Sequence, residues 1–278
     1  MTDNQAVNII SQRLLAYTVA IDAPGCGGQR TLAKLLVSSL LRTGWPGEIL
    51  LFHNGEEPIF RTPRGGLEEV ALDLESPGGE AGALLAWKHK YLVAERISAE
   101  RYDRILFLDA DCLVLRDLSH LLEGYWDISV QPERTMTRWN HYSYLTEVEL
   151  ASPTMASRNG INSGTWAVRG TVFHEVMAEW RRIDESPPLR ECRCRDQSSW
   201  NRLLLDNEMT GRWKVQEWPE GEIAFPLYLH TRYQDYIRAA LTHQLGGETT
   251  EKLRFTFSLW FGNFIYEDSC LFFQFMEA

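Results

Sequence analysis

Short, nearly continuous apolar runs recur along the first half of the chain, and segments with helical periodicity separate them. Runs of this kind are typical of strands that are buried on both faces, which occur mainly in parallel sheets. The sequence therefore predicts an α/β fold, with a mainly parallel sheet sandwiched by helices. The predicted strands span residues 14–21, 48–54, 69–74, 104–108 and 127–132, and the predicted helices span 29–42 and 81–98.

Two aspartates interrupt the strand-like run LFLDADCLVL, residues 106–115. Asp109 and Asp111 are two positions apart, so they project to the same side if the backbone is extended. Adjacent carboxylates at the end of a buried strand repel each other, and a divalent cation relieves this repulsion. Oxygen ligands of this kind favour Mg²⁺ or Mn²⁺. The alternative is a solvated pair that caps the next helix or pairs with Arg104 or Arg116.

The charge of the chain limits its partners. With 28 Lys and Arg residues against 38 Asp and Glu residues, the formal net charge is −10 at pH 7. Proteins that bind nucleic acids normally carry a basic surface, so we expect no nucleic-acid partner. An anionic substrate is compatible with this charge if a bound cation lies between substrate and protein.

No segment of the sequence is typical of export or membrane insertion. The residues MTDNQAVNIISQR lack the pattern of a signal peptide, and no apolar stretch is long enough to span a bilayer. The five cysteines are scattered, which is typical of reduced thiols, and the CxC pair Cys192 and Cys194 lacks the second pair of a structural zinc site. We therefore expect a cytoplasmic protein without a transmembrane segment.

We expect two parts of the chain, a main domain over residues 1–245 and an aromatic extension over residues 246–278. The extension contains FTFSLWFGNFIYEDSCLFFQF, in which glycine, asparagine and acidic residues interrupt the aromatic ones. Such a segment forms part of the core, a contact with a second subunit in a homodimer, or an apolar lip that contacts the acceptor of a reaction.

Glycines follow the first predicted strand in PGCGGQRT, residues 24–31. The spacing matches neither GxxxxGK[ST] nor GxGxxG, so neither phosphate-binding motif is present. The segment is either a tight turn from strand to helix or a loop whose backbone approaches a ligand. Ligands of open α/β sheets bind beyond the carboxyl ends of the strands, and both this loop and Asp109 fall there.

Four motifs follow in a fixed order along the chain: YDRILFLDADCLVLRDL at 102–118, GINSGTWAVRG at 160–170, RDQSSWNRLL at 195–204 and PLYLHTRYQ at 226–234. In this order, residues 14–235 resemble the GT-A nucleotide-sugar glycosyltransferases, in particular the family that contains glycogenin and the bacterial lipopolysaccharide galactosyl- and glucosyltransferases. The resemblance implies a GT-A fold and transfer of a hexose from UDP-glucose or UDP-galactose to a hydroxyl acceptor, with retention of anomeric configuration.

The resemblance implies a metal site. Asp109, Asp111 and His230 correspond to the family's ligands of Mn²⁺ or Mg²⁺, and the cation bridges the diphosphate of the donor. The family usually has a glycine and a lysine after its histidine, whereas HTRYQ offers Arg232 as a phosphate ligand. The alternative for His230 is an ordinary histidine at the end of a strand.

The resemblance also implies residues that bind the donor. Asp22 corresponds to a position near the nucleobase and ribose. Lys88 or Lys90 corresponds to a lysine that contacts the donor phosphate or sugar, and the sequence does not choose between the two. Lysines on helices are otherwise mostly solvated.

Three residues correspond to the sugar pocket of the family: Asn162, Asp196 and Gln197, of which the last two are candidate catalytic residues. The Gln197 amide is a poor nucleophile, so we expect a front-face substitution, in which the acceptor hydroxyl attacks on the side from which the diphosphate leaves. In an alternative mechanism, Asp196 forms a transient covalent bond to the sugar. The local alternatives are that Asn162 holds a turn and that Asp196 is a helix N-cap.

Aromatic residues in the long, weakly patterned stretch 132–160 are candidates for acceptor binding. Trp139, His141, Tyr142 and Tyr144 offer flat faces to a sugar ring or an apolar group. The competing interpretation is that they pack the loop against the domain. The acceptor itself, a saccharide, a lipid-linked sugar, a peptide or a small molecule, is not encoded in any motif.

Two functions of other classes compete with sugar transfer. LDADCLVL is also similar to the DxDGT loop of haloacid dehalogenase-type phosphatases, but Cys112 and Leu113 replace its glycine and threonine. The other alternative is a non-catalytic protein that binds nucleotide sugars on the same fold. The complete set of Asp109, Asp111 and His230 argues against a site that has lost its activity.

Overall fold

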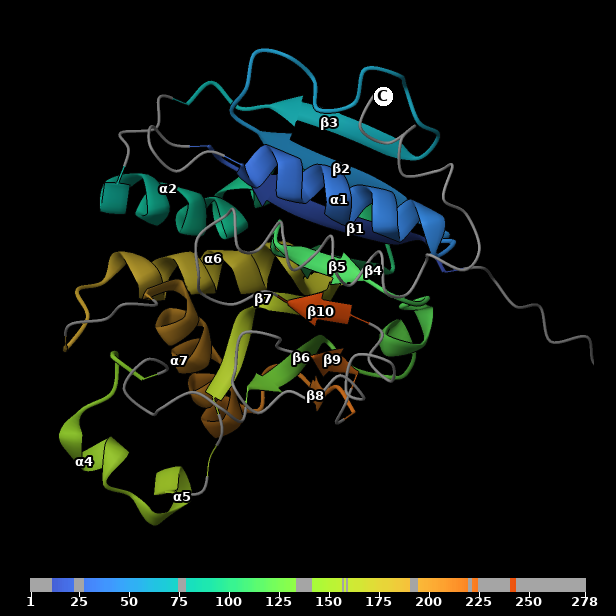
Figure 1. Cartoon of the computed structure of the whole chain (residues 1–278). Coiled ribbons are helices and arrows are strands. Elements are labelled where there is room, and N and C mark those ends of the chain that lie inside the picture. Colours follow the sequence, from blue (N-terminus) through green and yellow to red (C-terminus); the bar gives the residue numbers. More distant parts are fainter. Residues whose placement is uncertain are drawn as a thin grey trace, which may run out of the picture.

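The computed structural model has the α/β architecture that the sequence predicts (Figure 1). It describes residues 12–22, 28–74, 79–133, 142–156, 158, 160–190, 195–219, 222–224 and 241–243. The strands are β1 (Leu14–Ala20), β2 (Glu48–His53), β3 (Leu67–Ala71), β4 (Arg104–Leu108), β5 (Cys112–Val114), β6 (Ile128–Glu133), β7 (Gly160–Arg169), β8 (Val215–Glu217), β9 (Ile223–Ala224) and β10 (Leu241–His243). The α-helices are α1 (Gln29–Arg42), α2 (Gly79–Leu92), α4 (Glu147–Leu150), α5 (Pro153–Ala156), α6 (Phe173–Glu185) and α7 (Arg195–Thr210).

The main sheet is mainly parallel, as expected from its buried strands. Its order within the described residues is β3-β2-β1-β4-β7-β6-β8, and a smaller sheet has the order β5-β10-β9. Strands β3, β2, β1 and β4 run parallel to one another, as do β6 and β8, whereas β7 runs antiparallel to both of its neighbours. The direction of β7 brings the start of this strand to the edge where β4 and β6 end.

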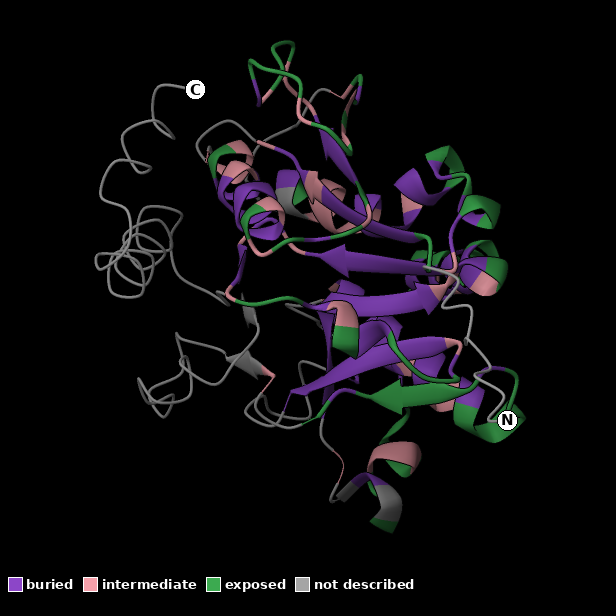
Figure 2. Ribbon diagram, turned by 90° about the vertical axis from the view of Figure 1, so that its right-hand side faces the viewer, coloured by how far each residue is buried: buried purple, intermediate pink, exposed green. Residues whose placement is uncertain are grey.

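Helices cover both faces of the sheet. In β1, Leu15 and Tyr17 face the layer formed by α2, α6 and α7, whereas Leu14 and Ala16 face α1 and the segment after β5. This alternation follows from the two-residue period of a strand, and both of its faces are apolar because both are covered. Figure 2 shows the resulting arrangement, with buried strands between two helical layers.

Aromatic rings fix α6 and α7 against the sheet. The ring centroids of Trp180 in α6 and Trp200 in α7 lie 4.7 Å apart, and Trp200 lies 5.3 Å from Trp166 in β7. Trp166 in turn stacks on Phe107 of β4 at 5.1 Å. Such aromatic contacts stabilise a core beyond the area that they bury. They give the two helices a fixed position at the edge where β4 ends.

The observed elements differ from the predicted ones mainly at their ends. The strand predicted at 69–74 spans Leu67–Ala71, and the helix predicted at 81–98 ends at Leu92, where a short 3₁₀ helix, Val93–Arg96, continues the chain. Part of the long stretch 132–160 folds into the short helices α4 and α5. The aromatic extension and the CxC pair lie outside the described residues. Among the helices that the structure describes, none is long and apolar enough to cross a membrane.

Candidate active site

Polar side chains gather at the carboxyl edge of the main sheet. Asp109 directly follows β4, Asp22 follows β1 after one residue, and Glu133 ends β6. The antiparallel strand β7 begins at this same edge, where its Gly160 pairs with Glu133. Open α/β sheets bind their ligands at this edge, so we describe the candidate site from here.

The two aspartates of the DxD motif lie in a turn between β4 and β5. The backbone N–H of Cys112 donates to the carbonyl oxygen of Asp109 at 2.9 Å, which closes the turn. The backbone at the motif is therefore a turn, and the condition under which Asp109 and Asp111 project to the same side of an extended strand is not met. The motif leaves the sheet after Asp109, whose backbone N–H still donates to the carbonyl oxygen of Gly164 in β7 at 2.8 Å. The Arg104 guanidinium donates instead to the carbonyl groups of residues 122 and 124.

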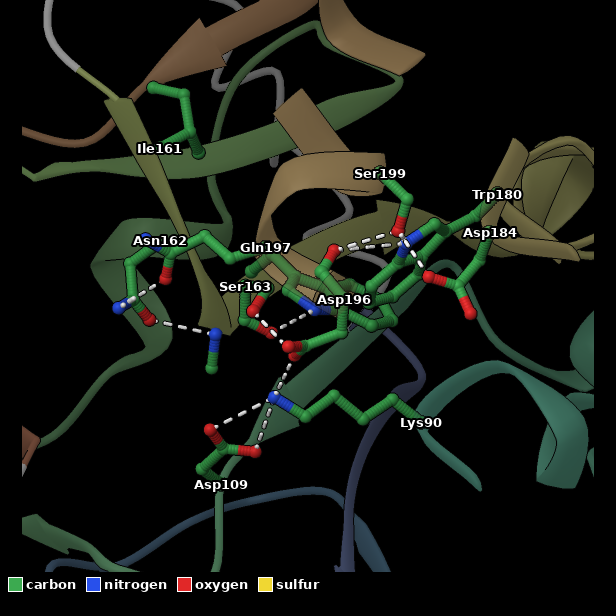
Figure 3. Close-up of polar contacts among 12 residues, drawn as sticks. Lys90, Asp109, Ile161, Asn162, Ser163, Trp180, Asp184, Asp196, Gln197 and Ser199 are labelled. Atoms are coloured by element: carbon green, nitrogen blue, oxygen red, sulfur yellow. Dashed lines mark hydrogen bonds and ion pairs between the residues drawn. The ribbon is translucent and has the colours of Figure 1, made fainter. Parts of the chain in front are cut away.

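The ammonium group of Lys90 bridges two carboxylates that come from different elements (Figure 3). Its Nζ lies 3.0 Å from Oδ1 of Asp109 and 2.8 Å from Oδ2 of Asp196. We call Lys90, Asp109 and Asp196 the Lys90 triad. The side chains of Lys90 and Asp196 are each 7% exposed, whereas that of Asp109 is 25% exposed, so Asp109 is the member that a ligand reaches from solvent.

Lys90 therefore meets the candidate site, and Lys88 is a half-buried residue of the same helix. The backbone also holds Lys90 in place, because the hydroxyl of Tyr17 in β1 donates to its carbonyl oxygen at 2.7 Å. The ammonium group lies 5.6 Å from the ring centroid of Phe107, a cation–π distance.

Electrostatics keep Lys90 charged. Burial alone lowers its pKa, but the charges of Asp109 and Asp196 and their hydrogen bonds outweigh this effect, and the net shift of the pKa is upward. The formal charge of the Lys90 triad is −1, and Asp111 adds a further negative charge. Burial, and after it Asp111 and Asp109, raises the pKa of the Cys112 thiol, which stays neutral. Among these residues the carboxylates outnumber the one ammonium group, a formal balance that favours a cation.

Asp196 is not a helix N-cap, because α7 begins at Arg195 and Asp196 lies within the first turn. Its Oδ2 accepts a hydrogen bond from the hydroxyl of Ser163 at 2.7 Å, in addition to the ion pair with Lys90. A carboxylate in the first turn of a helix is also stabilised by the helix dipole. The N-cap interpretation of Asp196 is therefore wrong. Its carboxylate belongs to a buried polar network with Lys90 and Ser163.

Two further polar side chains, those of Asn162 and Gln197, form a cluster with Glu133, which is 1% exposed. The amides of Asn162 and Gln197 donate to its Oε2 at 3.0 and 3.3 Å, and Asn162 Nδ2 also lies 3.2 Å from Gln197 Oε1. Asn162 Oδ1 also accepts from the backbone N–H of Gly164 at 2.7 Å, a local contact within strand β7 rather than in a turn between elements. The cluster joins the end of β6, the start of β7 and the first turn of α7.

An irregular pairing in β7 directs these side chains. Val130 of β6 pairs with Trp166, but Pro132 pairs with Ile161, so β7 has several extra residues at this point. Irregular strands of this kind redirect side chains next to binding sites. The extra residues include Asn162 and Ser163, which contact Gln197 and Asp196 of α7 respectively.

Asp22 supports the start of α1. Its Oδ1 accepts from the backbone N–H groups of Gln29 and Arg30 at 2.7 and 3.4 Å. Its own backbone exchanges two hydrogen bonds with the side-chain amide of Asn54, which follows β2. Gly28, directly before α1, has φ of 105°, a conformation that glycine adopts readily. Asp22 thus connects the segment after β1 to the start of α1 and to Asn54, and contact of Asp22 with a nucleobase stays a prediction.

The remaining predicted residues fall into two groups. His230, Arg232, Trp139 and His141 lie outside the described residues. Tyr142 is 2% exposed and packs in a small apolar cluster with Leu145 and Met155, which favours the packing interpretation for this residue. Within the described ranges, no group of three or more His, Cys, Asp and Glu side chains is placed to hold a metal ion.

Sequence reasoning missed Glu133, Ser163 and Asn54. Glu133 is an acidic residue at the end of an apolar strand, and Asp109 directly follows another such strand. This shared position is a signal in the sequence that could have identified Glu133. Ser163 lies inside the NSG motif, next to the Asn162 that was singled out. Asn54 carried no signal, because its contact with Asp22 joins residues 32 positions apart.

Comparison with known proteins adds to this geometry. No protein-family model matches the chain, and no curated protein matches it. Two solved glycosyltransferase structures are similar over most of the chain. The bifunctional glycosyltransferase WbbM, in its apo form, has a TM-score of 0.59 at 12% identity over 86% of this chain and 47% of WbbM. This chain thus spans about half the length of WbbM.

The second structure is the galactosyltransferase LgtC in complex with donor and acceptor sugar analogues. Its TM-score is 0.57 at 12% identity, over 90% of this chain and 99% of LgtC. The chain has the GT-A fold. The predicted fold is thereby confirmed, and the candidate site lies on a GT-A sheet. In this GT-A fold, Cys112 and Leu113 are buried in β5, at the positions where the phosphatase loop has glycine and threonine.

Replacing Lys90 by methionine should destabilise the protein, because Asp109 and Asp196 then face each other without the ammonium group. We expect the free energy of unfolding to fall by about 3 kcal/mol, a typical cost of breaking a buried ion pair. Urea denaturation measures this loss. The matched control is Lys88→Met on the same helix, with an expected loss below about 1 kcal/mol. Equal losses for the two variants would contradict the role of the Lys90 triad.

Proposed function

We propose that this protein is a metal-dependent glycosyltransferase that moves a hexose from a nucleotide sugar to a hydroxyl acceptor with retention of configuration. UDP-glucose and UDP-galactose are the proposed donors. The observation that carries the proposal is the Lys90 triad at the carboxyl edge of a GT-A sheet, beside the cluster of Glu133, Asn162 and Gln197. The two similar structures are both of glycosyltransferases, which supports the same reaction class here.

The donor set of the DxD turn fits a divalent cation. Asp109 and Asp111 supply carboxylate oxygens, which suit Mn²⁺ or Mg²⁺, and a quarter of the Asp109 side chain is exposed. We propose His230 as a third ligand. A bound cation would neutralise the diphosphate as it leaves. In this proposal Asp109 would contact both Lys90 and the cation, and the Lys90 ammonium group would supply further positive charge for the departing diphosphate.

The side chains around the triad are suited to a sugar. Glu133 accepts, and the amides of Asn162 and Gln197 both donate and accept, so together they match hydroxyl groups, which also do both. These groups already satisfy one another by hydrogen bonds, and a sugar hydroxyl would exchange one such bond for another. We propose Asp22 for the nucleobase and ribose, and Arg232 for the diphosphate.

The contacts of Asp196 favour the front-face mechanism. Its carboxylate is paired with Lys90 and accepts from Ser163, and both contacts stabilise the negative charge and weaken it as a nucleophile. Gln197 is uncharged. In the front-face reaction, the bond between the sugar and the diphosphate breaks, the acceptor oxygen bonds to the sugar on the same face, and the diphosphate takes the acceptor proton. The protein contributes orientation and electrostatic stabilisation.

Removing one carboxylate of the DxD turn should strongly reduce metal-dependent turnover. For Asp111→Asn we expect Mn²⁺-dependent hydrolysis of UDP-glucose or UDP-galactose to fall by about two orders of magnitude, because several kcal/mol of charge stabilisation are lost. Release of UDP measures the rate. Asp117→Asn is the matched control, because Asp117 is exposed and its contacts to Ser119 are ones that asparagine can keep. Turnover of a phosphomonoester, without a nucleotide sugar, would instead support a phosphatase.

The stereochemistry of the product tests the mechanism. We expect the anomeric configuration of the donor to be retained, which proton NMR of the first product formed detects. We also expect no glycosyl adduct on Asp196 in mass spectra of protein quenched during turnover. An adduct that Asp196→Asn abolishes would establish the covalent alternative. An inverted product would exclude both mechanisms.

A further inference from the structure

A second buried carboxylate, Asp184, lies close to the Lys90 triad without belonging to it (Figure 3). Asp184 is the penultimate residue of α6 and is 2% exposed. Its Oδ2 accepts from the hydroxyl of Tyr91 at 2.9 Å, and its Oδ1 accepts from the hydroxyl of Ser199 at 2.9 Å. Nε of Arg195 lies 3.9 Å from Oδ1. Asp184 thus joins α6 to both α2 and α7.

Two of these partners are neighbours of the triad in sequence. Tyr91 directly follows Lys90 in α2. Ser199 lies one turn after Asp196 in α7, and its hydroxyl is 3.0 Å from the backbone oxygen of Asp196. The two helices that supply Lys90 and Asp196 are therefore both tied to the same carboxylate.

The indole of Trp180 completes this connection. Its Nε1 donates to the Ser199 hydroxyl at 2.9 Å and lies 3.3 Å from the backbone oxygen of Asp196. A serine hydroxyl has one hydrogen to donate, and both Oδ1 of Asp184 at 2.9 Å and the backbone oxygen of Asp196 at 3.0 Å lie within its reach. The carboxylate carries a charge and is the stronger acceptor of the two. The orientation of the Ser199 hydroxyl, and with it the first turn of α7, is thus fixed by two residues of α6.

Burial of the charged Asp184 carboxylate costs free energy. A buried carboxylate loses its hydration, and only well-aligned partners offset that loss. Burial, and next the charge of Asp184, raises the pKa of Tyr91, so this phenol keeps its proton and continues to donate. An apolar side chain of similar size would fill the same space without the cost of desolvation. The carboxylate is therefore explained by the two hydroxyl groups that it aligns rather than by packing.

We propose that Asp184 is a positioning residue, which sets the distance and alignment of Lys90 and Asp196 through Tyr91 and Ser199. The inference rests on the proposed function, because it assigns a purpose to this alignment in the donor site. Sites of this kind lose activity when a functional group moves by about 1 Å.

Asp184→Asn tests this role. The variant keeps the shape of the side chain but places an N–H group opposite a hydroxyl donor. We expect kcat for Mn²⁺-dependent hydrolysis of the donor to fall about ten- to hundredfold, with KM changed by less than about threefold. The assay is run well below the Tm of the variant. Tyr91→Phe, which removes one hydrogen bond and keeps the charge, should lower kcat by about three- to tenfold.

Asp127→Asn is the matched control. Asp127 is also paired with an arginine, Arg169, at 3.3 Å and accepts from the backbone N–H of Lys214 at 2.9 Å. It precedes β6, whereas Glu133 ends this strand, so it lies at the opposite edge of the sheet. We expect Asp127→Asn to lower Tm and leave kcat unchanged.

Thermal unfolding separates the failure of this inference from failure of the proposed function. If the wild-type protein hydrolyses no nucleotide sugar, the function fails, and the Tm values of Asp184→Asn, Lys90→Met and the double variant still test the positioning role. We expect the double variant to lose less than the sum of the single losses, because Asp184→Asn already weakens the contact of Lys90 with Asp196. Additive losses in Tm would overturn the inference. An unchanged kcat of Asp184→Asn in an active enzyme would also overturn it.

Discussion

One buried ammonium group, that of Lys90, holds together the edge of the sheet on which the proposed function depends. It lies between Asp109, which follows β4, and Asp196, in the first turn of α7. Without it, two carboxylates would face each other with little solvent to screen them, which favours protonation or separation. With it, the two carboxylates and the ammonium group carry a formal charge of −1, and Asp109 is the most exposed of the three side chains. The same contact therefore serves stability and, in our proposal, donor binding.

Packing of the apolar core places Lys90 between Asp109 and Asp196. The apolar faces of α2, α6 and α7 share one core with the inner faces of β1, β4 and β7, and the indoles of Trp166, Trp180 and Trp200 form its centre. Because β7 runs antiparallel, its irregular start meets the ends of β4 and β6, and Ser163 and Asn162 reach α7. The polar network lies directly at the rim of this aromatic core, so its geometry follows from the packing beneath it.

The sequence predicted the layers and most strands well, because periodicity and apolar runs are local signals; β4, for example, has the predicted bounds. It also singled out Asp109, Asn162, Asp196 and Gln197, which the structure brings close to one another. It did not choose between Lys88 and Lys90, because that choice depends on which face of α2 packs on the sheet. It missed Glu133 and Asp184, whose partners are distant in sequence. It also did not reveal the turn at the DxD motif, which a hydrogen bond from Cys112 closes.

The central claim is that the acidic turn after β4 carries a cation through which an acidic protein holds an anionic donor. Calorimetric titration of the protein with UDP, with and without Mn²⁺, measures this directly, because it needs neither an acceptor nor a chemical step. We expect the Kd for UDP to be at least about tenfold lower with Mn²⁺, since the cation supplies the charge that offsets the diphosphate. Equal Kd values under the two conditions would contradict the claim.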